Sequence, residues 1–124
     1  ALAGETITVN DPGGFGDWIH AGDVADGLAR MLRADKLDHS VYNIAFGALE
    51  TLGDLLAYTT EAVPGTRWET ASDQEADILA DVRRRSGRFG AYDISRMTDE
   101  FAWRPRPLRE AMHHYIDWLR ENES

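Results

Sequence analysis

Carboxylate and histidine side chains are the groups of this sequence that could carry out acid–base or metal chemistry. Asp23 and Asp93 are candidate proton donors or acceptors, but each stands at the start of a predicted helix. A carboxylate there accepts hydrogen bonds from free backbone N–H groups and is favoured by the helix dipole. We therefore expect both to be structural. His20 alternates with apolar neighbours on a predicted strand, which favours a packed, hydrogen-bonded histidine over a metal ligand.

The other potential metal or nucleophilic groups are few. His113 and His114 are adjacent in a predicted helix, so their side chains point about 100° apart and do not easily bind one metal ion. The 124 residues contain no cysteine, which excludes disulfides, a thiol nucleophile and a Cys-ligated metal. The loop at 11–16 lacks the G-x-G-x-x-G spacing of a dinucleotide-binding turn. We predict no catalytic, cofactor-binding or metal-binding residue in the chain.

Composition sets the broad class of protein. Hydrophobic residues make up 43% and charged residues 28% of the chain, which is typical of a soluble globular domain. The formal net charge is −9, and this argues against a nucleic-acid or anionic-membrane binder, since phosphate contacts need basic groups. No segment approaches the ~20 apolar residues of a membrane span, and no signal peptide is recognisable. We expect a cytoplasmic protein.

Short strands and helices must position these groups. Alternation of polar and apolar residues predicts short strands at 5–10, 17–20, 41–44 and 66–70. Asp23 is the predicted N-cap of a helix that ends near Ala34, with a buried stripe of Val24, Leu28, Met31 and Leu32. Thr51 and Asp54 have the spacing of a capping box, and the helix that they open stops at Pro64-Gly65.

The C-terminal third contains two further helices. Ser95 is a predicted N-cap, with Met97 and Phe101 on one face of a short helix. Pro105 and Pro107 end that helix and precede the next. Apolar residues then recur at helical spacing: Leu108, Ala111, Met112, Tyr115, Ile116 and Leu119. We expect Trp103, Tyr115 and Trp118 to be core aromatics. The predicted class is α/β, with short strands and about four helices.

Three segments resemble one family. The stretch at 17–27, DWIHAGDVADG, is similar to Arg-Asp-(Phe/Tyr)-Ile-(Tyr/His)-Val-x-Asp-(Val/Leu)-Ala. The stretch at 41–47, VYNIAFG, followed by Thr51-Leu52, is similar to Val-Tyr-Asn-(Ile/Leu)-Gly-x-Gly. The stretch at 93–118 is similar to Asp-x-Ser-(Lys/Arg), Leu-Gly-Trp-x-Pro and a terminal helix that closes on Trp. These segments occur in the order found in the extended short-chain dehydrogenase/reductases, the NAD-dependent epimerases and dehydratases. The resemblance covers roughly residues 5–118.

The resemblance implies that residues 1–124 are the C-terminal substrate-binding domain of a longer enzyme. In that family NAD or NADP is held by an N-terminal Rossmann domain, and catalysis uses a Tyr four residues before a Lys. Lys36 is the only lysine, and the residue four positions before it is Leu32 and not a tyrosine. We therefore expect this chain to bind no cofactor, to be inactive alone and to have the missing N-terminal domain as a partner. We also expect self-association through an unpaired strand at 41–44, giving a possible homo-oligomer.

The resemblance also implies substrate-binding residues. Thr8, Val9 and Asn10 match the strand that lines the nucleotide-base pocket, although an edge strand with a polar face explains them equally well. Leu52 matches an apolar position near the base, and a core role is the alternative. Arg85 or Arg88 could bind a diphosphate through the planar guanidinium, or belong to a solvated run of charge. The arginine that often precedes the family aspartate is here Gly16.

Three functions stay open from the sequence. The parent protein could be an NAD(P)-dependent epimerase or dehydratase acting on a nucleotide-sugar. Because Gly16 removes one expected phosphate contact, it could instead be a reductase or dehydrogenase whose small-molecule substrate carries no nucleotide. The third is a stand-alone, non-catalytic binding domain that kept the fold.

Overall fold

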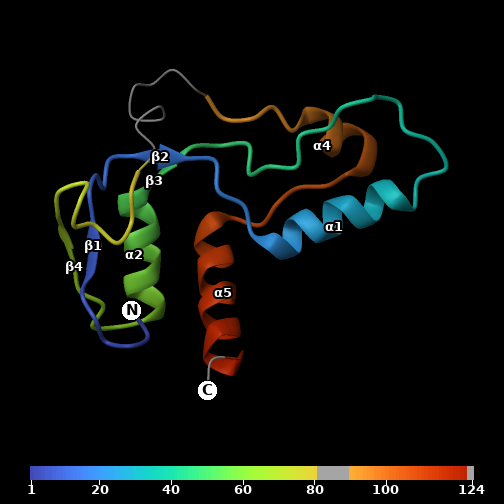
Figure 1. Cartoon of the computed structure of the whole chain (residues 1–124). Coiled ribbons are helices and arrows are strands. Elements are labelled where there is room, and N and C mark those ends of the chain that lie inside the picture. Colours follow the sequence, from blue (N-terminus) through green and yellow to red (C-terminus); the bar gives the residue numbers. More distant parts are fainter. Residues whose placement is uncertain (81–89, 123–124) are drawn as a thin grey trace.

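The computed structural model describes residues 1–80 and 90–122, and the elements follow one another along the chain as labelled in Figure 1. The helices within these residues are α1 (Ala21–Leu32), α2 (Leu52–Ala62), α4 (Ser95–Phe101) and α5 (Leu108–Asn122). The strands are β1 (Ile7–Val9), β2 (Phe15–Gly16), β3 (Glu50–Thr51) and β4 (Trp68–Thr70). The expected α/β class, with short strands and four helices in the described residues, is confirmed.

The strands form two small pairs. β1 lies parallel to β4 with Ile7 opposite Trp68, and β2 lies antiparallel to β3 with Phe15 opposite Thr51. Val9 also forms an isolated parallel bridge to Ile78, which brings the segment after β4 alongside β1. Strands this short are not independently stable, so the helices that cover them hold the pairs in place.

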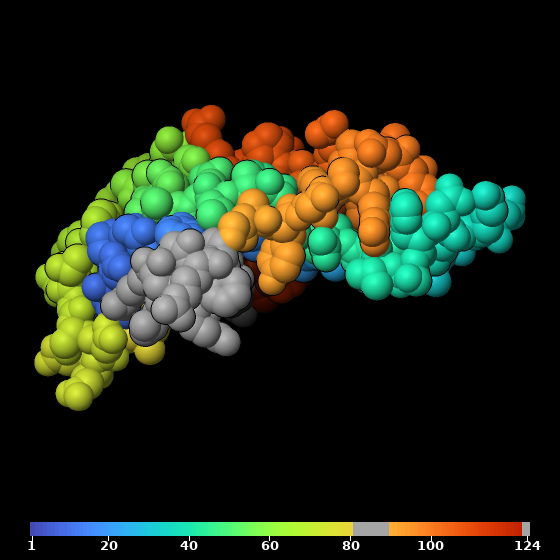
Figure 2. All heavy atoms as spheres, turned by 90° about the horizontal axis from the view of Figure 1, so that it is seen from above, coloured from blue at the N-terminus to red at the C-terminus, as the bar shows by residue number. Residues whose placement is uncertain are grey.

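The core has two centres. One lies between β1 and α2, where Val9, Leu52 and Leu56 are buried and Trp18 packs against them. Helix α5 runs beside α2 (Figure 1) and buries Leu108, Ala111 and Ile116. The other centre, between α1, α4 and the chain after α4, holds Met97 and Trp103, which are 0% and 1% exposed. Figure 2 shows that the molecule is elongated, with β4 toward one end and the segment that follows α1 toward the other.

The capping box predicted for α2 is confirmed. The Asp54 N–H donates to the Thr51 hydroxyl at 3.1 Å, and the Thr51 N–H donates back to the Asp54 carboxylate at 2.8 Å. Because both bonds satisfy N–H groups that have no partner within the helix, they fix where α2 begins. This start matters for the site, since the first two turns of α2 form one of its walls.

Asp23 is not the N-cap of α1, which begins earlier, at Ala21. The His20 imidazole is the cap, because its Nδ1 accepts the Gly22 N–H at 2.9 Å. Asp23 lies in the first turn of the helix and is 8% exposed. Its carboxylate accepts the backbone N–H of Arg106 at 3.1 Å and the Arg106 Nε–H at 2.9 Å. It therefore ties α1 to the chain before α5, a structural role that differs from the capping role expected for it.

The expected N-cap at Ser95 is also wrong. Ile94 precedes the helix without a side-chain cap, and Asp93 Oδ1 accepts the Ser95 N–H at 2.9 Å. That bond lowers the pKa of the Asp93 carboxyl, and it confirms a structural role for this residue too. Helix α4 ends at Ala102 in the left-handed conformation, with φ 49°. The turn brings the Trp103 indole to the backbone oxygen of Asp23 at 3.1 Å.

Four expectations about strands and burial are contradicted. Residues 17–20 and 41–44 are extended but outside any strand, and β2 lies just before the first of them. The stripe expected to be buried on α1 is largely open, since Leu28 is 48% and Leu32 86% exposed. Of the three expected core aromatics only Trp103 is buried; Tyr115 and Trp118 are about half exposed and stack on each other on the outside of α5.

Within the described residues, none of the helices has both the length and the apolar character needed to cross a lipid bilayer.

Candidate functional site

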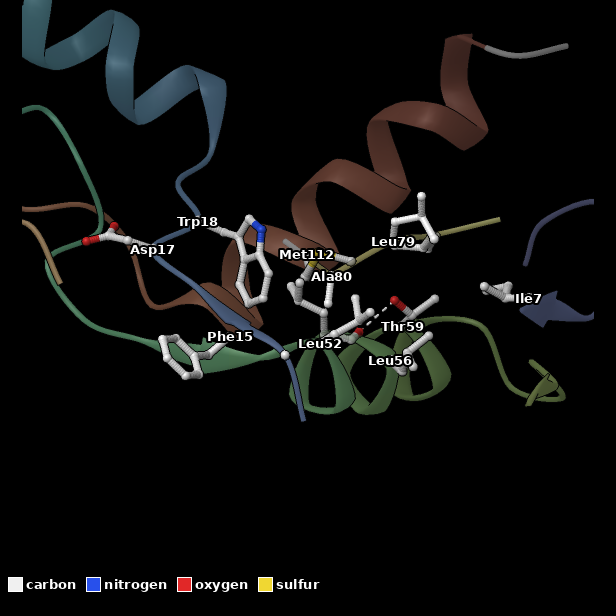
Figure 3. A pocket seen from close by; sticks show the side chains of 13 residues that line it. Ile7, Phe15, Asp17, Trp18, Leu52, Leu56, Thr59, Leu79, Ala80 and Met112 are labelled. Atoms are coloured by element: carbon white, nitrogen blue, oxygen red, sulfur yellow. Dashed lines mark hydrogen bonds between the residues drawn. The ribbon is translucent and has the colours of Figure 1, made fainter. Parts of the chain in front are cut away.

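An apolar cavity of about 410 Å³ lies where five parts of the chain meet, one of them Ile7 of β1 (Figure 3). Helix α2 forms one wall, the segment 14–18 a second and the segment 78–80 a third, while Met112 of α5 closes the space between them. The size is within the range of small-molecule sites. The residues that line it are Ile7, Gly14, Phe15, Asp17, Trp18, Leu52, Leu55, Leu56, Thr59, Ile78, Leu79, Ala80 and Met112.

Asp17 is the charged residue of this lining, and its carboxylate is already engaged. Oδ1 accepts the Phe46 N–H at 2.6 Å and the Gly47 N–H at 3.1 Å, and Oδ2 accepts the Tyr92 N–H at 2.9 Å. These bonds join three distant segments at the edge of the cavity. Asp17 therefore acts as an anchor of backbone N–H groups, and it is not a free base aimed at a ligand.

The position of the Trp18 ring depends on the glycine two residues before it. A Cβ atom on Gly16 would lie 2.7 Å from Cε2 and 2.8 Å from Cζ2 of the indole, closer than real Cβ atoms approach such atoms. The ring therefore occupies space that a side chain at position 16 would take. In Figure 3 the indole stands in the cavity wall near Met112 and Ala80.

The third wall is held by residues that the sequence placed in a substrate pocket. Thr8 Oγ1 donates to Asp77 Oδ2 at 2.8 Å, and the Asp77 N–H donates back to it at 2.9 Å. The Thr8 N–H also donates to Asp77, and this bond is the largest cause of that carboxyl's lowered pKa. The Asn10 side chain accepts the Ala80 N–H at 2.8 Å. Thr8 and Asn10 thus position the segment 78–80 instead of lining the cavity themselves.

The other predicted substrate-binding residues have different places. The Val9 side chain is fully buried in the core, so only its backbone could meet a ligand. Leu52 is 6% exposed and belongs both to the core and to the cavity lining, so its core role is confirmed, and its contact with a nucleotide base stays a prediction. Arg85 and Arg88 lie outside the described residues. Contact of these residues with a substrate stays a prediction.

A second apolar cavity, of about 300 Å³, lies on the other side of Trp18. Trp18, Leu55 and Met112 line both cavities, and His20 and Tyr115 line this one alone. Sequence reasoning assigned no ligand-binding role to Trp18 or to the segment 78–80. The signal was present: an indole two residues after a glycine, and three apolar residues, Ile78, Leu79 and Ala80, interrupting a polar and acidic stretch.

His20 is packed and hydrogen-bonded, as expected. Its Nδ1 accepts from Gly22, so its proton is on Nε2, which lies 3.2 Å from Nδ1 of His114. Burial lowers the pKa of His20, with smaller contributions from Arg106 and His114. His113 faces elsewhere, 3.5 Å from the Glu61 carboxylate. Among the described residues, no three histidine or acidic side chains are grouped so that they could hold a metal ion.

This arrangement of short strands, helix pairs and a corner at Trp103 defines a class of fold. The chain has the fold of the C-terminal part of the extended short-chain dehydrogenase/reductases, as the resemblance in the sequence implied. Neither a family model nor a curated protein sequence matches the chain. The likeness is therefore one of structure.

Three solved structures illustrate the match. The chain is similar to dTDP-glucose 4,6-dehydratase from Bacillus anthracis in complex with NAD, with a TM-score of 0.73 and 21% identity over 98% of this chain and 37% of that one. For UDP-glucose 4-epimerase from Bifidobacterium longum in complex with NAD+ and UDP, the values are 0.70, 19%, 96% and 36%. For a GalE-like L-threonine dehydrogenase from Cupriavidus necator they are 0.66, 20%, 93% and 42%. The chain thus spans about two fifths or less of the length of these proteins.

Proposed function

We propose that this chain forms the substrate-binding part of an NAD(P)-dependent epimerase, dehydratase or dehydrogenase of the extended short-chain dehydrogenase/reductase type. The observation that supports this most strongly is the match of nearly the whole chain to about 37% of an NAD-complexed dehydratase. The remainder of such an enzyme would bind the dinucleotide and carry the catalytic tyrosine. This chain would supply the pocket that orients the substrate, and it would be inactive alone.

The neighbours offer two classes of substrate for the proposed enzyme. One is a nucleotide-sugar, as the names of the dehydratase and the epimerase indicate for those proteins. In that case Thr8, Asn10, Leu52 and one of Arg85 and Arg88 would contact the nucleotide. The other is a small molecule without a nucleotide, as the name L-threonine dehydrogenase indicates for its protein. The apolar lining of the cavity and the glycine at position 16 favour this second class.

We also propose a docking face for the cofactor domain, formed by exposed apolar residues of α1 and of the segment that follows it. Leu28 and Leu32 of α1, together with Leu37 and Val41, expose 47–86% of their surface on one part of the chain. Residues 41–44 belong to no strand in the described part of the chain, and Ile44 lies near Gly27 of α1. Exposed apolar side chains such as those of the four residues above favour contact with another folded body. In the absence of the cofactor domain, a second copy of the chain would occupy this face.

The test begins with the sequence upstream of Ala1. A glycine-rich strand–turn–helix followed by Tyr-x-x-x-Lys is expected there, and the full-length protein should bind NAD or NADP, as measured by calorimetry. The 124-residue chain should bind neither dinucleotide. A natural chain that starts at or just before Ala1, or a full-length protein that binds no dinucleotide, would reject the proposal and favour a stand-alone binding domain.

A further inference from the structure

The chemistry of the residues that line the 410 Å³ cavity indicates which kind of substrate fits it. Of the described residues that line it, Asp17 has a carboxylate, Thr59 a hydroxyl and Trp18 an indole N–H, and the others have apolar side chains or none. Asp17 is engaged with three backbone N–H groups, and the Thr59 hydroxyl donates to the Leu55 carbonyl at 2.7 Å. No lysine, arginine or histidine is among these residues. A diphosphate needs cationic donors that neutralise its charge, and these walls offer it a carboxylate and apolar carbon.

Trp18 gives the cavity its shape. The indole separates the 410 Å³ cavity from the 300 Å³ cavity, since both are lined by Trp18, Leu55 and Met112. Its ring position depends on the missing side chain at Gly16, where an added Cβ would lie 2.7 Å from the ring. Phe15 lines the same cavity. Aromatic rings present flat apolar faces on which another ring can stack.

We propose that Gly16 and Trp18 form a specificity-determining pair, and that the cavity takes the uncharged, apolar ring of a carbonyl or alcohol substrate and rejects a nucleoside diphosphate. The inference rests on the proposed function, because it assumes that this cavity is where substrate binds. It goes further by naming the substrate class. Gly16 lets the indole form the wall, and the indole provides the face against which the substrate ring packs.

The test uses two probes on the 124-residue chain. Prodan, an uncharged naphthalene ketone, represents the proposed class, and its fluorescence reports binding. UDP-glucose represents the nucleoside diphosphates. We expect saturable binding of one prodan per chain, with a shift of the Trp18 indole N–H resonance in ¹H–¹⁵N spectra. Millimolar UDP-glucose should neither displace prodan nor shift that resonance. Displacement, or a shift by UDP-glucose, would overturn the inference.

Variants locate the binding. Gly16→Ala, which pushes the indole from its place, should weaken prodan binding at least tenfold. Gly90→Ala is the matched control, because nothing lies within 4 Å of a Cβ at Gly90, and it should bind as the parent chain does. Leu79 is 58% exposed at the cavity rim, so Leu79→Glu leaves the core intact and should also weaken binding. Equal prodan affinity in the parent chain, Gly16→Ala and Leu79→Glu would refute the inference, and Leu79→Glu alone decides if Gly16→Ala does not fold.

The two proposals fail in different ways. A full-length protein that binds NAD and converts a UDP-sugar would reject this inference and leave the proposed function standing. A full-length protein that binds no dinucleotide would reject the proposed function, and with it the reading of the prodan site as a substrate site.

Discussion

Replacing Asp23 by alanine tests whether the buried carboxylate of α1 has a structural role. The Asp23 side chain is 11% exposed and that of its partner Arg106 is 26% exposed. Asp23→Ala removes two hydrogen bonds from Arg106, each made to a charged acceptor. It also leaves the Arg106 guanidinium at a site from which most water is excluded. The joint between α1 and the chain before α5 should therefore weaken.

The magnitude follows from this burial. Removing one partner of a fully buried ion pair destabilises a protein by roughly 3–5 kcal/mol. The Arg106 side chain is 26% exposed, so we expect a smaller loss of about 2–3 kcal/mol in the free energy of unfolding. Alanine has about 0.5 kcal/mol better intrinsic helix propensity than aspartate, but Asp23 lies in the first turn of α1, where the helix dipole favours a carboxylate by a similar amount. The net loss should therefore stay at about 2–3 kcal/mol, which is a large part of the stability of a small domain.

Urea unfolding followed by circular dichroism measures this loss. With an m-value of about 1.5 kcal/mol per molar urea, the midpoint of Asp23→Ala should fall by more than 1 M. Asp26→Ala is the matched control on the same helix. Its pair with Arg30 is exposed, at 50% and 41% of the side chains, and such pairs contribute about 0.5 kcal/mol or less. That control should therefore unfold close to the parent chain.

A double variant separates the ion pair from simple loss of packing. Arg106→Met removes the charge that Asp23→Ala leaves uncompensated, so the double variant should be more stable than the sum of the two single changes predicts. If Asp23→Ala and Asp26→Ala shift the midpoint equally, the structural account of Asp23 is wrong. Its carboxylate would then be open to a chemical role.

Three further changes have clear expected outcomes. Thr51→Ala should lower the free energy of unfolding by about 1 kcal/mol. The Thr51 hydroxyl is also the main cause of the lowered pKa of Asp54, so the parent chain should lose this stabilisation as pH falls below about 4. In urea unfolding, the stability of the variant should therefore fall less steeply with decreasing pH than that of the parent chain. Gly47 and Gly65 both have positive φ, but of the two only Gly47 has a side chain, that of Ile94, within 2.9 Å of an added Cβ. The melting temperature of Gly47→Ala should therefore lie well below that of Gly65→Ala. Equal melting temperatures would contradict this. Burial is the largest cause of the lowered pKa of His20, so the fold favours the neutral imidazole, which is also the form that accepts the capping bond from Gly22. This stabilisation is fully present above pH ~6.5 and is lost as pH falls below that value. His20→Asn, a cap that does not titrate, should flatten the change in stability between pH 7 and 5, and an unchanged slope would count against the assignment.

Local signals in the sequence predicted the helices well. The capping box of α2 and the apolar repeat of α5 depend on residues three or four positions apart, and such patterns can be recognised without knowing the rest of the fold. The sequence predicts a start of α1 three residues too late, because Asp23 is the commoner type of N-cap residue and His20 is the actual cap. An imidazole is a rarer cap than a carboxylate, so the preference pointed to the wrong residue.

Non-local contacts explain why the sequence could not predict the partners of the candidate site residues. Thr8 and Asn10 alternate with apolar residues on a strand, and the resemblance placed them toward a ligand. Their partners, Asp77 and the Ala80 N–H, come 69 and 70 residues later in the chain. No periodicity in the sequence encodes that pairing. The same holds for Trp18, whose role depends on the empty space at Gly16 and on walls supplied by α2 and the segment 78–80.

The exposed stripe of α1 bears on the proposed docking face. One side of the helix already packs on this chain, where Gly27 lies against Trp103 and Arg30 donates to the Phe101 carbonyl at 3.1 Å. Leu28 and Leu32 lie on another side, separated from Gly27 by 100–140° around the axis, so their exposure is not a defect of that packing. A helix with apolar residues on two sides is expected between two folded bodies.

Leu32→Lys tests this reading, because Leu32 is 86% exposed in the chain alone. The change should leave the unfolding of the monomeric chain within about 0.5 kcal/mol of the parent, as surface changes usually do. It should nevertheless reduce self-association in light scattering at high concentration. In the proposed full-length enzyme the same lysine would remove about 2 kcal/mol of burial from the domain contact. A full-length variant as stable as its parent would show that no second body covers α1, and a parent chain that is monomeric at every concentration would show that copies of the chain do not substitute for it.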